Sequence, residues 1–186
     1  RFGTKFTPFT TPDYFYPKTS VIEFLKKEEG LFRIAVSDSR ILPPNFSTYY
    51  RIQSIEGYDP LYLLSYAELI AASEREDHSI KPPYGFNRII TPHNINSKII
   101  DLMNVKYVLS LSELDSPKFA KVFQEGQTRV YENKNVLPRA FFVERTIAED
   151  NKNNIIKMMF EQDLSRAAII GKNNLGRENF AVGNVR

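Results

Sequence analysis

Two segments of this chain pass directly from a helical pattern into a strand pattern, and this order constrains the fold more than any other feature. In the first, Ser20 and Glu23 have the order of a capping box, a glycine stops the helix, and the apolar run 31–36 indicates a buried strand. In the second, a short helix within 94–103 precedes an alternating strand at 105–111. Helices that lead into strands in this way predict the α/β class.

The remaining predicted elements extend this class to a single domain. Asp59-Pro60 is a typical helix start, because aspartate can cap and proline at the first helical position loses no hydrogen bond; the helix is expected to reach about residue 72. The others are a turn of helix after Ser116 that ends before Gly126, strands at 128–132, 140–144 and 167–170, and a helix at 151–162. About five strands and four or five helices predict an α/β fold, with α+β as the alternative, in which helices pack on one mixed β-sheet.

Domain boundaries follow from proline content and from the chain ends. Three prolines within 1–18 exclude a long helix and predict an extended lead-in or linker. The α/β domain is expected over 19–172, and 173–186 are expected to be a tail leading to a further region. Because the chain begins with Arg1 instead of Met, we expect it to be an excised piece of a longer protein.

Charge and composition exclude several classes of protein. The formal net charge is +3, acidic residues are interleaved with basic ones, and no basic run exceeds two residues, so we expect no nucleic-acid partner. No run of 18 or more apolar residues is present, and the chain as given is not expected to span a bilayer. The absence of cysteine excludes disulfides, thiolate catalysis and cysteine-ligated zinc.

Motifs for catalysis, metals and cofactors are missing as well. His78 and His93 lack the spacing of a metal-binding helix, the eight glycines are dispersed, and no Gly-x-Ser-x-Gly occurs. We therefore predict no catalytic residue, no metal and no cofactor. Carboxylates such as Glu56 and Asp59 leave a glycosidase pair open, because sequence spacing does not give the separation in space on which such a pair depends.

The predicted helix at 60–72 is apolar on most sides. Its only polar interior positions are Ser65 and Glu68, which predict a thin solvated stripe. Such a helix must be covered on its other faces. The cover is either the domain itself, or a neighbouring segment or membrane surface outside this chain.

Five short segments occur in an order that resembles a known family. They are Phe32-Arg33-Ile34, Leu42-Pro43-Pro44-Asn45, the run 56–61, the run 102–109, and the run 130–143. Together they look like the extracytoplasmic C-terminal region of YfhO-type bacterial membrane proteins. These polytopic proteins are similar to the GT-C glycosyltransferases, which take sugar from a polyprenyl-phosphate carrier outside the cytoplasmic membrane.

The resemblance covers roughly residues 30–145 and implies a role without catalysis for this chain. In GT-C-like enzymes the catalytic acid lies in an early loop beside the first membrane helices, which this chain does not contain. The implied location is the extracytoplasmic face of the bacterial cell membrane. The implied partners are the transmembrane part of the same parent chain and a cell-envelope glycan or lipid-linked sugar.

Three residues are candidates for ligand binding: Asn45, Tyr58 and Asp59. The Pro-Pro-Asn turn and the Gly57-Tyr58-Asp59 turn can bring an aromatic face and amide or carboxylate groups together, a combination that suits sugars. The alternative is structural: a rigid turn at Asn45, a positive φ at Gly57, a packed Tyr58 and a helix cap at Asp59.

Three functions remain open at this point. The first is the non-catalytic extracytoplasmic domain that the resemblance implies. The second is a free-standing carbohydrate-active enzyme, which needs two carboxylates at catalytic separation in one pocket. The third is a protein–protein interaction module, which would expose leucine and tyrosine side chains of the 60–72 helix.

Overall fold

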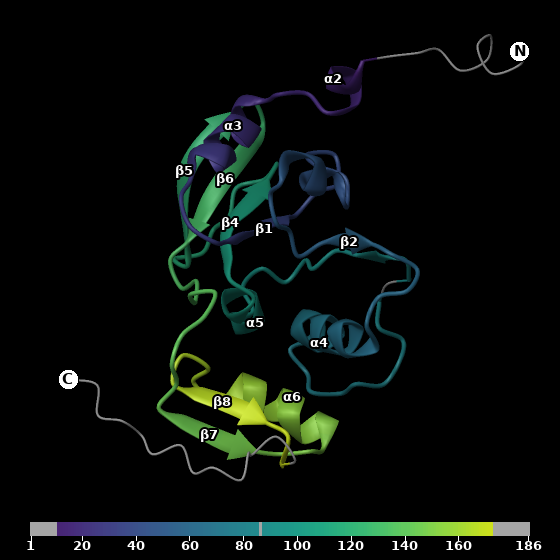
Figure 1. Ribbon diagram of the computed structural model, residues 1–186, viewed down its shortest axis with the longest axis vertical. Helices are drawn as coiled ribbons and strands as arrows, with labels where there is room; N and C mark the ends of the chain where they lie inside the picture. The colour runs from purple at the N-terminus through teal and green to yellow at the C-terminus, as the bar shows by residue number, and fades with distance from the viewer. Residues whose placement is uncertain (1–10, 86, 173–186) are drawn as a thin grey trace, which may run out of the picture.

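A four-stranded mixed sheet organises the upper part of the molecule in the computed structural model, which describes residues 11–85 and 87–172 (Figure 1). The strand order is β1-β4-β6-β5, with β1 parallel to β4 and the other neighbours antiparallel. The strands are β1 (Arg33–Val36), β4 (Val105–Ser110), β5 (Phe119–Glu125) and β6 (Thr128–Asn133). The predicted fold class, a mixed sheet with helices packed on it, is confirmed.

Two smaller sheets and the helices complete the fold. β2 (Gly57–Tyr58) pairs antiparallel with β3 (Ile89–Ile90), while β7 (Arg145–Ala148) pairs parallel with β8 (Ala167–Ile170). The helices are α2 (Pro12–Phe15), α3 (Ser20–Lys27), the 3₁₀ helix η1 (Phe46–Tyr50), α4 (Leu64–Arg75), α5 (Lys98–Leu102) and α6 (Lys152–Glu161). The β7–α6–β8 unit lies at the end of the molecule opposite α2 and α3 (Figure 1).

The N-terminus of α3 is capped differently from the predicted capping box. Thr19 is the N-cap, and its hydroxyl accepts from the Ile22 N–H at 3.3 Å. The N–H groups of the first two helical residues, Ser20 and Val21, donate to the Glu125 carboxylate at 3.1 and 2.9 Å. The hydrogen bonds from Val21 and Ser20 hold the pKa of Glu125 below its usual value. A negative charge at this position also interacts favourably with the helix dipole.

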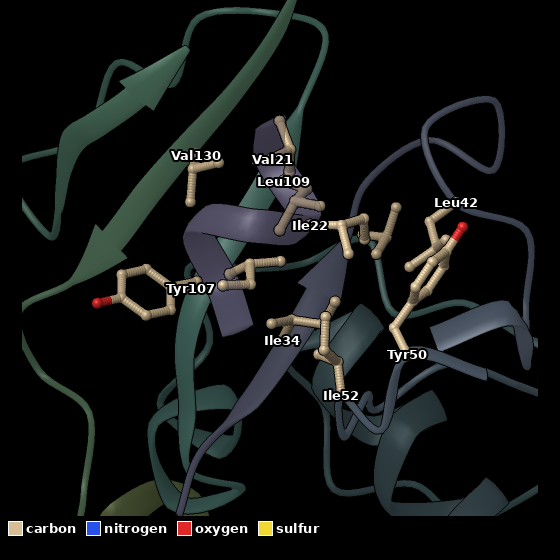
Figure 2. Packing of buried hydrophobic residues seen from close by; sticks show 11 residues of the cluster. Val21, Ile22, Ile34, Leu42, Tyr50, Ile52, Tyr107, Leu109 and Val130 are labelled. Atoms are coloured by element: carbon tan, nitrogen blue, oxygen red, sulfur yellow. The ribbon is translucent and has the colours of Figure 1, made fainter. Parts of the chain in front are cut away.

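The core lies on both faces of the central sheet. On one face, α3 and the segment around η1 cover the strands, and Figure 2 shows their side chains converging. The residues labelled there are Val21, Ile22, Ile34, Leu42, Tyr50, Ile52, Tyr107, Leu109 and Val130. On the other face, the buried cluster is Ala35, Ile55, Ile95, Ile100, Val105, Val108, Phe119 and Tyr131. Adjacent residues such as Val108 and Leu109 point to opposite faces, as the two-residue period of a strand requires.

A buried ionic cluster joins α5 to the β5–β6 hairpin. Lys118 Nζ lies 2.7 Å from Asp101 Oδ1 and donates to the main-chain carbonyls of Ile95 and Ser97 at 2.9 and 3.1 Å. Asn133 Nδ2 also donates to Asp101 Oδ1, at 2.7 Å. Burial lowers the pKa of Lys118, against the opposing effect of Asp101. The cluster fixes the start of β5 against the loop that precedes α5.

One predicted helix is a strand in the structure. Phe119 and Phe123, four residues apart, match a helical spacing, but the register of β5 against β6 shifts between Lys121 and Phe123. This bulge breaks the two-residue period, so that Phe119 packs on one face of the sheet and Phe123 on the other. The apolar spacing of this bulged strand is therefore the same as that of one turn of helix, which is why the sequence predicted a helix here.

Two other predicted boundaries are wrong. The helix expected from Pro60 begins only at Leu64, and the strand expected at 140–144 begins instead at Arg145 and pairs with β8, away from the central sheet. The predicted helices at 20–29 and 151–162 and the strands near 31–36 and 105–111 are confirmed with shorter ends. The strand at 167–170 has the predicted bounds, and the strand predicted at 128–132 is longer by one residue. Within the predicted lead-in, α2 forms one turn of helix. Residues 1–10 and the predicted tail at 173–186 lie outside the described residues.

The cover of α4 comes in part from α6. Glu68, predicted to lie in a solvated stripe, is buried and forms an ion pair with Lys152 of α6 at 3.3 Å. Lys98 of α5 donates to the Gln162 carbonyl at 2.7 Å and binds the same unit to the rest of the fold. None of the helices described at 11–85 and 87–172 has the length and apolar character that crossing a membrane requires.

Candidate functional site

The candidate site is a groove made of two adjoining cavities beside the outer edge of β1. The first cavity has a volume of about 460 Å³ and the second about 470 Å³, and Arg33, Ser54 and Glu56 line both. Asp59, Tyr62, Tyr66 and Leu69 are among the residues that line the first cavity. Asn45, Ser47, Thr48, Arg51 and Gln53 are among those that line the second.

The segment before β2 reaches the site because it runs along β1 like an irregular extra strand. The Ile34 N–H donates to the Gln53 carbonyl at 2.9 Å, and the Ile55 N–H donates to the Ile34 carbonyl at 3.2 Å. Ser54 and Ile34 form a parallel bridge. This pairing occupies main-chain groups at the edge of β1 and brings Ser54 and Glu56 to the floor of the groove.

The Glu56 side chain holds β1 and the segment before β2 together. Its Oε1 accepts from the Val36 N–H and its Oε2 accepts from the Ser54 hydroxyl. Burial raises the pKa of Glu56, and these hydrogen bonds oppose that rise. The Tyr66 hydroxyl donates to the Ile55 carbonyl at 2.6 Å, and burial followed by the charge of Glu56 raises the pKa of Tyr66. The phenol of Tyr66 is therefore held neutral.

Replacing Glu56 is expected to change how stability depends on pH. A raised pKa in the folded state means that the carboxyl contributes stability below its unfolded pKa of about 4.5, and that this contribution is lost as the pH rises through the folded value. Glu56→Gln keeps an acceptor for Val36 and a donor toward Ser54, so it should remove this pH dependence and change stability at pH 7 by less than about 1 kcal/mol. Urea unfolding between about pH 4 and pH 8 measures the effect.

Glu56→Ala is the companion variant. It leaves the buried Val36 N–H without its acceptor and should destabilise the fold by about 1–3 kcal/mol. Equal pH profiles for the wild type and Glu56→Gln would show that the carboxyl titrates normally in the folded state.

Arg33 and Arg139 place positive charge at the groove. Arg33 Nη1 donates to the Met103 carbonyl at 2.8 Å, and Arg139 Nη2 donates to Gln53 Oε1 at 2.7 Å. Burial lowers the pKa of Arg33, and the nearby charge of Arg139 lowers it further. The two guanidinium groups are thus near enough to repel each other.

The structure places the three predicted ligand-binding residues on three different cavities. Asn45 lines the second cavity and Asp59 the first, whereas Tyr58 lines another, of about 990 Å³, with Arg88 and Ile89. Asn45 and Tyr58 do meet: Asn45 Nδ2 donates to the Tyr58 carbonyl at 2.7 Å, and the Tyr58 N–H donates to Asn45 Oδ1 at 3.1 Å. This pairing joins the two predicted turns, and ligand binding by these residues stays a prediction.

The structural alternative for these turns is correct in part. Asn45 itself adopts the left-handed conformation with φ 71°, which glycine favours and asparagine tolerates. Gly57 does not have a positive φ, since it begins β2. Asp59 does not cap α4; its Oδ1 accepts from the Leu61 N–H at 2.8 Å and stabilises a local turn. Tyr58 is 47% exposed and is not packed in the core.

The two carboxylates of the first cavity, Glu56 and Asp59, are both held by hydrogen bonds from the main chain. Glu74, in the last turn of α4, has a similar structural role, since its Oε1 accepts from the His93 and Asn94 N–H groups at 2.8 and 3.0 Å. No cluster of three potential metal-ligating side chains occurs among the residues that the structure describes. The groove therefore offers donors, acceptors and aromatic surface for binding.

Sequence reasoning named Glu56 and Asp59 but missed Arg33, Ser54 and Tyr66. Arg33 lies in an expected strand and Tyr66 in an expected helix, and neither residue belongs to a sequence motif for binding or catalysis. The two pairings that bring them to the groove, between Arg33 and Met103 and between Tyr66 and Ile55, depend on the fold. A polar residue at the first position of a strand was the only signal for Arg33.

Comparison with protein-family models, curated proteins and solved structures found no match to this chain.

Proposed function

We propose that this chain is a non-catalytic extracytoplasmic domain of a bacterial multi-pass membrane protein similar to the glycosyltransferases, and that its groove holds a cell-envelope glycan. The ordered sequence segments support the membrane-protein part of this proposal. The groove supports binding, because Tyr62, Tyr66 and Ser54 lie in it with an apolar wall at Leu69. Ligand sites of this kind combine apolar and aromatic surface with a few polar groups.

The observation that carries the proposal is that, among the residues that are described, the first cavity does not hold two carboxylates with free oxygens. A general acid or base must reach the substrate with a free oxygen, and a glycosidase pair needs two such groups at a defined separation. Glu56 uses one oxygen for Val36 and the other for Ser54, whereas Asp59 uses Oδ1 for Leu61 and keeps Oδ2 free of the described part of the chain, so this cavity has one free carboxylate and not a pair. This arrangement supports a site that binds a sugar over one that cleaves it.

Binding is tested by titrating the purified chain with neutral oligosaccharides of bacterial envelopes while recording amide chemical shifts. We expect shifts near Ser54 and Tyr66, and no release or transfer of sugar. Tyr62→Ala should weaken binding about two- to tenfold, because an aromatic contact contributes roughly 0.5–1.5 kcal/mol. Tyr49→Ala, an exposed tyrosine on η1, is the matched control and should bind as the wild type does. Sugar hydrolysis by the chain alone would overturn the proposal.

Location is tested in the parent protein expressed in its host. This chain contains no cysteine, so Glu29→Cys introduces one reactive thiol at an exposed position within it. A membrane-impermeant maleimide should label intact cells carrying Glu29→Cys above the level of the unchanged parent. Labelling that requires cell lysis would place the domain on the cytoplasmic side and contradict the proposal.

A second function, an interaction module, is favoured by the segment between β2 and α4. Leu61, Leu63 and Leu64 are 87, 75 and 53% exposed, which is unusual for three leucines so close together. We expect the triple serine variant of these leucines to stay folded and to reduce co-purification of the domain with the transmembrane part of its parent when the two are expressed as separate polypeptides. Leu31→Ser, at another exposed leucine, is the control. Unchanged co-purification by the triple variant would remove this function.

A further inference from the structure

Three arginines from separate parts of the chain gather at the second cavity of the groove. Arg33 and Arg51 line the cavity directly. Arg139 approaches from the segment after β6 and holds Gln53, another lining residue, through the 2.7 Å hydrogen bond to its Oε1. A strand and a loop thus each contribute an arginine to the lining of this cavity, and a distant segment places a third arginine on one of its lining residues.

These arginines lack the partners that arginines in folded proteins usually have. Among residues 11–85 and 87–172, none of the three forms an ion pair with a carboxylate. Glu56 lies at the same cavity, but its oxygens are taken by Val36 and Ser54. The side chain of Arg51 makes no hydrogen bond to the part of the chain that is described.

The mutual repulsion of Arg33 and Arg139 also favours an anionic ligand at this cavity. Arg33 is half-buried, and both this burial and the charge of Arg139 lower its pKa. Positive charges that are close together and form no ion pair raise the free energy of the folded state. An anion bound between them would relieve this cost, and the site therefore gains more from an anionic ligand than from a neutral one.

The remaining lining groups suit an anion with several oxygen atoms. The hydroxyls of Ser47 and Thr48 line the same cavity and make no hydrogen bond to any described residue. Guanidinium forks match the oxygens of phosphate, and hydroxyl groups can donate to the oxygens that remain. The volume of about 470 Å³ is large enough for a phosphate group together with the group that carries it.

We propose that Arg33, Arg51 and Arg139, brought together at the second cavity, form a binding site for a phosphate group. This assignment depends on the arginines and not on the proposed glycan, although both ligands would use the same groove. A molecule that carries both a sugar and a phosphate would occupy the two cavities together. The site binds its ligand without breaking or forming a covalent bond.

Calorimetric titration of the purified chain with inorganic phosphate at low ionic strength tests the proposal. We expect saturable binding of one phosphate per chain, weaker at about 0.15 M salt because screening reduces the attraction. Arg51→Gln should weaken binding about tenfold or more, as expected for a lost hydrogen bond between charged groups. Because the Arg51 side chain makes no hydrogen bond or ion pair with the part of the chain that is described, this variant should fold normally, whereas Arg33→Gln also loses the bond to Met103.

Arg88→Gln is the matched control, since it removes the same charge from an exposed arginine at a different cavity. It should bind phosphate as the wild type does. Equal weakening by Arg88→Gln and Arg51→Gln would show attraction to the net charge alone and overturn the proposal, as would the absence of saturable binding. The neutral oligosaccharide titration is independent: if it fails while phosphate still binds, the glycan proposal falls and the phosphate site stands.

Discussion

Lys118→Ala is expected to destabilise the fold by about 3–5 kcal/mol, the cost of breaking a buried ion pair by removing one partner. The side chains of Lys118 and Asp101 are only 8 and 12% exposed, and the ammonium group lies 2.7 Å from the carboxylate. Without the lysine, the Asp101 charge keeps only neutral partners such as Asn133, and the carbonyls of Ile95 and Ser97 lose a donor. Urea unfolding followed by circular dichroism measures the change.

Lys121→Ala is the control for this prediction. Lys121 lies on β5, close to Lys118, but it is exposed and stands 4.0 Å from Glu113, which is also exposed, so its removal should cost less than about 0.5 kcal/mol. The double variant Lys118→Met with Asp101→Asn should recover part of the lost stability, because it removes both buried charges. A Lys118→Ala protein as stable as Lys121→Ala would mean that the cluster is solvated and contributes nothing.

Leu109→Ala is expected to destabilise the fold by about 2–5 kcal/mol, which is the usual range for emptying a buried leucine site. Leu109 is fully buried in the central strand β4 and packs under α3 with Ile22 and Val130 (Figure 2). Neighbouring strands on both sides fix the backbone of β4, so the surroundings have little freedom to close the cavity. The midpoints of thermal and urea unfolding should both be lower than those of the wild type.

Leu31→Ala makes the same chemical change at an exposed site. Leu31 is 69% exposed just before β1, and its truncation should change stability by less than about 0.5 kcal/mol. Similar effects at Leu31 and Leu109 would contradict the packing of the central sheet described above.

The sequence predicts elements well where local signals agree. The helix α3, its following strand β1, and the pair α5 and β4 each combine a cap or breaker with a clear period, and all four are present near the predicted positions. β5 was missed because its bulge changes the period locally. The start of α4 was predicted too early because Asp59 forms a short turn and not a helix cap.

The candidate site was less accessible to prediction because it is made by contacts between distant segments. Glu56 and Asp59 were visible as neighbouring carboxylates, but their hydrogen bonds to Val36 and Leu61 decide that they are held in place. Arg139 meets Gln53 across 86 positions of the chain. No local pattern encodes such a meeting, which depends on the register of strands and on how the connecting loops pass over the sheet.

The cap that Glu125 provides for α3 has a consequence for the order of events during synthesis on the ribosome. The groups that it joins are 105 and 104 positions apart, so the first turn of the helix has no carboxylate partner until most of the chain has emerged. An eight-residue helix is unstable alone in water. We therefore expect α3 to become stable only after the β5–β6 hairpin has formed. The helix and the hairpin should then dock in one late cooperative step.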